Sequence, residues 1–96
     1  MLELRPVCEH CNKSLPPASV EAMICSFECT FCAECVKHVL KNVCLNCGGG
    51  FQPRPVRPKE KLEKYPPTDK IIHRPADMAH LSEIREKYKD IEPKDR

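Results

Sequence analysis

Hydrophobic residues in the first half of the chain first form two short strand-like pieces and then follow a helical spacing. The β-prone pieces AMIC (22–25) and TFC (30–32) lie on either side of SFEC, which predicts a short β-hairpin. In the next piece, AECVKHVLK (33–41), the apolar residues fall on one face of a short helix. Three glycines, Gly48–Gly50, then stop any regular element. The first half is therefore predicted to be a small α+β module covering residues 1–50.

Residues 51–75 show no hydrophobic period and are punctuated by proline. Pro53, Pro55, Pro58, Pro66 and Pro67 lie among Lys and Arg side chains. Because proline fixes φ and biases the preceding residue away from helix, the piece PRPVRP is predicted to be extended. We interpret residues 51–75 as a Pro-rich basic strap or linker. The PVRP element also suits an aromatic groove on a partner, which is a weaker alternative.

Near the C-terminus an apolar stripe returns at helical spacing and predicts an amphipathic helix over residues 76–92. The stripe consists of Met78, Leu81, Ile84, Tyr88 and Ile91, and Pro93 follows it. Packing of this stripe back onto the first half is the favoured interpretation, because the core there is small. Binding to a partner, or dimerisation through the helix, is the alternative.

Composition leaves the chain short of large core residues. Its 96 residues include no Trp, three Phe and two Tyr. A core this small needs cross-links, and eight Cys, all between Cys8 and Cys47, are the available source. The N-terminus lacks the apolar run of a signal peptide and no stretch matches a membrane span, so we expect a cytoplasmic protein. In that reducing compartment, closely paired cysteines favour metal over disulfides.

Charge divides unevenly between the two halves. Residues 1–50 carry four basic and five acidic side chains, and residues 51–96 carry twelve and nine, within a net charge of +2. Eight thiolates holding two Zn²⁺ would make the whole chain net negative. A general argument from basic charge to nucleic acid is therefore weak. The seven basic side chains between 54 and 74 are predicted to be a solvated linker, with contact to nucleic-acid phosphates as the alternative.

The spacing of the cysteines is typical of structural zinc. The order is Cys8-x2-Cys11, thirteen residues, Cys25-x3-Cys29-x2-Cys32-x2-Cys35, eight residues, Cys44-x2-Cys47. Eight thiolates make two closed four-sulfur sites for two Zn²⁺, and a closed site has no open position for a catalytic water. The chain is therefore predicted not to be an enzyme. His10 and His38 are alternative ligands, but the eight-Cys set balances without them. Ligand type alone leaves zinc and iron open.

Cys32 and Cys35 have a second interpretation, as a dithiol redox pair. They precede a predicted helix, whose N-terminal dipole favours thiolate. A redox pair, however, does not need six further cysteines at metal spacing. The structural interpretation is therefore favoured over a CxxC thiol redox protein.

The residues that follow each pair predict which cysteines share a metal. Asn12 after Cys11 and Gly48 after Cys47 tolerate the left-handed backbone of a tight knuckle. One knuckle and one helix start make the ligand arrangement of a treble clef. The predicted first site is Cys8, Cys11, Cys32 and Cys35, and the predicted second site is Cys25, Cys29, Cys44 and Cys47. Sequential pairing remains the alternative.

In ligand order and gap lengths, Cys8 to Cys47 resembles a RING finger in which every ligand is Cys. The resemblance implies a cross-brace and, as an alternative function, a ubiquitin-ligase-like scaffold. RING ligases generally have an aliphatic residue between the first two ligands, a Trp near the second zinc and a Pro after the seventh ligand. This chain has Glu9 and His10, no Trp, and Leu45 at those places. The surface that recruits a ubiquitin-conjugating partner is therefore not visible.

Three longer pieces, MLELRPVCEHCNKSLPP, ICSFECTFCAECV and CLNCGGGFQPRPVRP, resemble a family of small bacterial cysteine-rich proteins catalogued as a domain of unknown function. The resemblance implies a bacterial cytosolic protein and lowers the weight of the ubiquitin interpretation. We interpret the chain as a zinc-stabilised interaction module with a protein partner. A nucleic-acid-binding zinc protein is among the alternatives.

Overall fold

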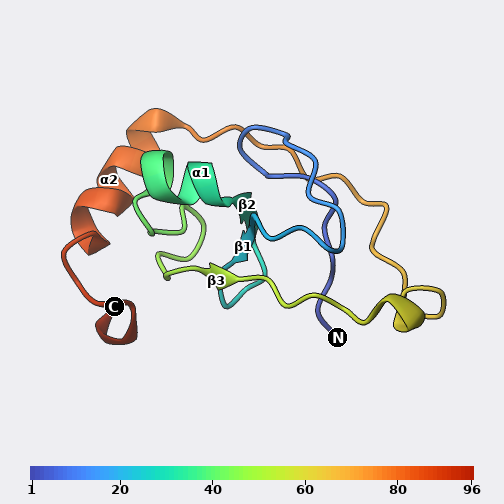
Figure 1. The fold of residues 1–96 in the computed structure, drawn as a ribbon. Coiled ribbons are helices and arrows are strands. Elements are labelled where there is room, and N and C mark those ends of the chain that lie inside the picture. Colours follow the sequence, from blue (N-terminus) through green and yellow to red (C-terminus); the bar gives the residue numbers. More distant parts are fainter.

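A three-stranded antiparallel sheet lies at the centre of the protein, in a computed structural model that describes residues 1–96 (Figure 1). Strands β1 (Ala22–Ile24), β2 (Thr30–Cys32) and β3 (Gln52–Pro53) are arranged in the order β2-β1-β3. In this register Met23 lies opposite Phe31 on one side and Pro53 on the other. The predicted hairpin over AMIC and TFC is confirmed, and β3 adds a strand that the proline pattern did not predict.

The turn between β1 and β2 is closed by the backbone of two cysteines. The amide of Cys25 donates to the carbonyl of Cys29 at 3.2 Å, and the amide of Glu28 donates to the carbonyl of Cys25 at 3.0 Å. Glu28 has φ of 64°, the left-handed conformation that tight turns require. The turn therefore places two thiols near each other at the end of the hairpin.

A short helix follows β2 directly. One turn of α-helix, α1 (Ala33–Cys35), continues as the π-helical segment η1 (Val36–Leu40). The segment ends at Lys41 and Asn42, with φ of 52° and 59°. The helix predicted over 33–41 is confirmed, but its wider turns were not predicted, because apolar spacing over nine residues does not distinguish the two geometries.

Cysteines form much of the core. Phe31 and Phe51 pack edge to face, with ring centroids 5.5 Å apart. Around them, six of the 13 residues in the central buried cluster are cysteines. Thiols are small and bury little apolar area, so a core of this composition depends on what holds the thiols together.

The proline-rich segment 51–75 is bound to the rest of the protein at several points. Its start is part of the sheet, and the side chain of Arg54 is 4 % exposed. The Arg54 guanidinium donates to three carbonyls, those of Arg5, Leu15 and Pro16, at 2.9, 3.1 and 2.9 Å. After the 3₁₀ turn η2 (Lys59–Lys61), the amide of Thr68 donates to the carbonyl of Leu4. In Figure 1 this segment returns along the N-terminal residues.

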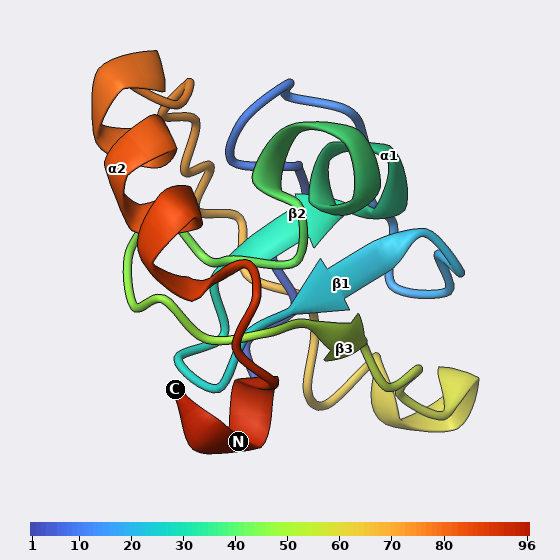
Figure 2. The same cartoon turned by 90° about the vertical axis from the view of Figure 1, so that its left-hand side faces the viewer.

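Helix α2 (Met78–Tyr88) lies on the side of the protein opposite to η2 (Figure 1) and is followed by the 3₁₀ turn η3 (Pro93–Asp95). Asp77 caps α2, because its Oδ1 accepts from the amides of Ala79 and His80. Leu81 is fully buried in the central cluster and Met78 is 56 % exposed. Figure 2 shows α2 beside the helical turns that follow β2. No helix has the length and apolar character needed to cross a membrane.

Candidate metal centre

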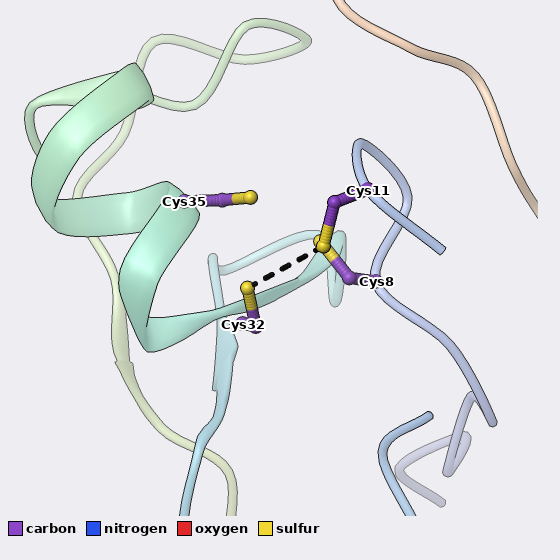
Figure 3. A group of neighbouring side chains, drawn as sticks. All are labelled: Cys8, Cys11, Cys32 and Cys35. Carbon is purple, nitrogen blue, oxygen red and sulfur yellow. Dashed lines mark hydrogen bonds between the residues drawn. The ribbon is translucent and has the colours of Figure 1, made fainter. Parts of the chain in front are cut away.

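Four thiols converge at the first cluster, which joins an N-terminal knuckle to the end of β2 and the start of α1 (Figure 3). The Sγ atoms of Cys8, Cys11, Cys32 and Cys35 all lie within 4.8 Å of one another. The Sγ atoms of Cys11 and Cys32 are 3.7 Å apart. A tetrahedron with metal–sulfur bonds of about 2.3 Å has edges of about 3.8 Å. A disulfide needs about 2.05 Å, so this spacing fits a shared metal ion, and all eight cysteines are free.

Local backbone geometry forms the first knuckle. The amide of Asn12 donates to the carbonyl of Cys8 at 3.0 Å, and the amide of Cys8 donates to the carbonyl of Lys13 at 2.9 Å. Asn12 has φ of 64°, as expected from a residue that tolerates the left-handed region. The two thiols of the knuckle are thereby turned toward the pair at the start of α1.

The second cluster contains three thiols at the same spacing. The Sγ atoms of Cys25, Cys44 and Cys47 lie within 4.8 Å of one another. The second knuckle is closed by the amide of Gly48, which donates to the carbonyl of Cys44 at 2.7 Å, and Gly48 has φ of 79°. The structure therefore brings together three of the four cysteines predicted for the second site.

Cys29, the fourth predicted ligand, lies beside this cluster, but its Sγ is not within 4.8 Å of all three other sulfurs. Its side chain is buried and accepts a hydrogen bond from Nδ2 of Asn46 at 3.4 Å. The pKa of Cys29 is lowered to about 5, chiefly because the Cys44 thiol donates a hydrogen bond to its sulfur, with a smaller contribution from Asn46. Cys29 is therefore held beside the second knuckle by Asn46, and its surroundings favour the thiolate.

Three other buried thiols, Cys25, Cys35 and Cys44, hold their protons more strongly. Burial raises the pKa of Cys25 to about 11. The pKa of Cys44 is raised by its hydrogen bond to Cys29 and then by burial, and the pKa of Cys35 is raised chiefly by burial. Crowded thiols therefore ionise together only when a cation neutralises them. Two clusters of four and three cysteines fit metal ions by donor type and spacing.

Backbone amides support individual sulfurs. The amide of Phe27 donates to Sγ of Cys25 at 3.3 Å, and the amide of Gly49 donates to Sγ of Cys47 at 3.4 Å. For Cys11, burial alone would raise the pKa, but the amide of Lys13 and the neighbouring thiols lower it overall. Such donors orient a thiolate and stabilise its charge.

Two polar residues near the clusters were not predicted as part of the site. Asn46 lies inside the second knuckle and contacts Cys29. Glu9 lies inside the first knuckle, is 5 % exposed, and accepts from the amide of Thr30 at 2.7 Å and from Arg5 at 2.9 Å. In the sequence, Glu9 was visible only as an acidic residue where RING fingers have an aliphatic one.

Neither alternative histidine ligand belongs to a cluster. Nδ1 of His10 accepts a hydrogen bond from the amide of Ala76 at 2.9 Å. His38 has a side chain 58 % exposed and lies 3.4 Å from Glu34. The groups of residues able to hold a metal contain cysteine alone.

Two comparisons with known proteins found a match for this chain. Residues 1–57 match a family model described as "Protein of unknown function (DUF1272)". The chain is also similar to an uncharacterized protein of Rhizobium meliloti (strain 1021), with 52% identity over 79 residues, which cover 82% of this chain and 94% of the relative. No solved structure matches the chain.

Proposed function

The chain belongs to the DUF1272 family of proteins of unknown function, and we propose that it is a zinc-stabilised interaction module with two structural Zn²⁺ and no catalytic activity. The observation that carries this proposal is the first cluster, where four thiols meet within 4.8 Å of one another. Four thiolates complete a tetrahedron and leave no position for a reacting water. The metal would therefore stabilise the fold and take no part in a reaction.

We assign the first ion to Cys8, Cys11, Cys32 and Cys35, and the second to Cys25, Cys29, Cys44 and Cys47. Two observations support this pairing: Cys29 belongs to the same buried cluster as Cys25 and Cys44, and its sulfur accepts a hydrogen bond from Asn46, which lies between Cys44 and Cys47. The arrangement is a RING-like cross-brace in which a knuckle and a helix start hold one ion, as in a treble clef.

A protein partner is favoured by the exposed tip of the hairpin. Phe27 is 72 % exposed in the turn between Cys25 and Cys29, and the amide of Phe27 is bound to Sγ of Cys25. An aromatic side chain on a rigid turn loses little conformational entropy on binding, and such residues are enriched at protein interfaces.

The reducing cytoplasm, where thiols remain available to metal, is the compartment that suits this module.

Three alternatives receive less support from the structure. Both arginines of PRPVRP are bound within the chain: Arg54 is buried, and Arg57 donates to the carbonyls of Tyr65 and Leu2 at 2.7 and 2.6 Å. They are therefore not free to contact phosphates or a partner's groove. The redox alternative needs an accessible thiol pair, but Cys32 and Cys35 are 2 % and 6 % exposed.

Metal analysis of the purified protein tests the proposal. We expect two zinc ions per chain by mass spectrometry of the metal content, a colourless solution, and tetrahedral tetrathiolate bands after replacement by Co²⁺. Iron would be visible as colour. A well-folded chain without metal, whose thiols cycle with thioredoxin, would contradict the proposal and favour the redox alternative.

Binding through Phe27 is tested by photo-crosslinking in the native lysate. Phe27→Ala should lose the crosslinked partner, whereas Val20→Ala, at a side chain that is 90 % exposed, serves as the matched control. Equal crosslinking of both variants would exclude the hairpin tip as the interface. The metal content of both variants should remain at two ions.

A further inference from the structure

The C-terminal residues 73–96, which we call the clasp, are bound to the first knuckle. Three hydrogen bonds join them to residues 8–11: the amide of Arg74 donates to the carbonyl of Glu9 at 2.7 Å, Nε2 of His73 is 3.2 Å from the carbonyl of His10, and the amide of Ala76 donates to Nδ1 of His10 at 2.9 Å. All of these acceptors lie between Cys8 and Cys11. The clasp therefore recognises the conformation of the knuckle itself.

The clasp is also bound to the second knuckle, residues 44–48. Nε2 of His80 is 3.0 Å from the carbonyl of Leu45. The ring of Tyr88 lies against Gly48, where an added Cβ would be 2.7 Å from Cε2 of the tyrosine. Arg96 donates to the carbonyl of Gly48 at 3.1 Å. One continuous segment therefore contacts the knuckles of both metal clusters.

Between the knuckles, the clasp is anchored on η1, which directly follows Cys35. Arg85 donates to the carbonyl of Val39 at 2.8 Å, and Leu81 is fully buried in the central cluster. A cavity of about 280 Å³ lies beside Cys47, and His80 and Tyr88 of the clasp form part of its wall. The clasp thus borders the half-buried thiol of the second knuckle.

We propose that the clasp retains the metal ions: it slows their release from both clusters, and loss of metal in turn frees the clasp. This inference rests on the proposed zinc sites. The clasp binds backbone carbonyls of the knuckles. The positions of these carbonyls depend on the knuckle backbone, which closes around metal-bound sulfurs. Because binding free energies are coupled reciprocally, a segment that prefers the metal-bound conformation must stabilise bound metal by the same factor. Release is slowed as well, because the contacts of the clasp with a knuckle must open before the thiolates of that knuckle can leave the ion.

The test measures the rate of zinc release from the full-length, zinc-loaded chain. The probe is excess 4-(2-pyridylazo)resorcinol, a chelator that changes absorbance when it takes Zn²⁺. Tyr88→Ala, and a combined variant with Arg85→Gln and Arg96→Gln, should each release zinc about fivefold faster or more than wild type. Met78→Ala, on the same helix but 56 % exposed, should release zinc at the wild-type rate.

Hydrogen exchange supplies the reverse measurement. Amides of residues 78–88 should be protected in the zinc-loaded chain and lose that protection after chelation. Variants that start with two ions and release them at the wild-type rate would overturn the clasp and leave the zinc sites intact. Protection that persists without metal would overturn both the clasp and the metal-dependent fold. A wild-type chain that cannot be loaded with zinc would overturn the proposed function as well.

Discussion

The two halves of the protein are stabilised by different means. Residues 1–50 contain all eight cysteines and a core in which thiols replace large apolar side chains. Residues 51–96 contribute two fully or nearly buried apolar side chains to that core, Phe51 and Leu81. They are also held by hydrogen bonds from arginine, histidine and backbone amides to the first half and by packing of Tyr88 against Gly48. From this comparison we propose that the first half needs metal to fold and that the second half needs the folded first half.

Removal of metal should produce the largest effect and tests this dependence directly. Binding of structural zinc contributes on the order of 10 kcal/mol per site to folding. A strong chelator should therefore unfold both halves together, measured by circular dichroism and by the dispersion of the NMR spectrum. Tyr88 resonances provide the control, because they report on the second half. A metal-free chain that keeps a dispersed spectrum would show that the thiol core is stable by itself.

Single cysteine variants come next and compare the two clusters. Cys32→Ser should release the first ion and Cys29→Ser the second, so that each protein retains at most one zinc by mass spectrometry. The Cys29 variant is the stricter test of the ligand set, because Sγ of Cys29 lies outside the group of three sulfurs that are within 4.8 Å of one another. Retention of two ions and full thermal stability by Cys29→Ser would remove Cys29 from the ligand set.

Leu81→Ala should have a smaller effect that originates in the second half. Leu81 is 0 % exposed, so truncation should lower the free energy of unfolding by about 2–5 kcal/mol. Chemical denaturation of the zinc-loaded protein measures the loss. Met78→Ala, at an exposed site on the same helix, should change stability by about 0.5 kcal/mol or less. Equal effects at the two sites would mean that α2 does not pack as described.

Arg54→Met should have the smallest effect of the series. The substitution keeps much of the buried side-chain volume but leaves the carbonyls of Arg5, Leu15 and Pro16 without their donor. Burial lowers the pKa of Arg54, and no acidic partner offsets the cost of burying its charge. Removing the charge therefore recovers part of the stability that is lost with the three hydrogen bonds. We expect a decrease of about 1–3 kcal/mol by denaturation, with metal content unchanged. A stabilised variant would show that burying the charge costs more than its three hydrogen bonds return.

The sequence predicted the features that depend on local spacing. The hairpin, the helix after it and the convergence of Cys8, Cys11, Cys32 and Cys35 follow from alternation, helical period and residues that accept positive φ. Pro53 and its neighbours hid β3, because proline normally argues against a strand and is tolerated here at the sheet edge. The sheet edge is a tertiary property that a local pattern does not contain.

Contacts between the two halves could not be predicted for a different reason. Arg54, Arg85 and His80 all bind backbone carbonyls, and every residue has a carbonyl, so no side-chain pattern identifies the partner. Glu9 and Asn46 were missed in the same way, because each acts through contacts between residues distant in sequence. The displacement of Cys29 from its group likewise depends on how the hairpin turn packs against the second knuckle.

Strand β2 also limits how the length of this chain can vary. Cys29 directly precedes the strand and Cys32 is its last residue, so two residues separate a ligand assigned to one ion from a ligand assigned to the other. Successive side chains in a strand point to opposite faces. Inserting or deleting a single residue here would turn one of these sulfurs away from its ion, however small the added side chain. Loops elsewhere can lengthen, but the distance between these two cysteines is fixed by the geometry of one strand.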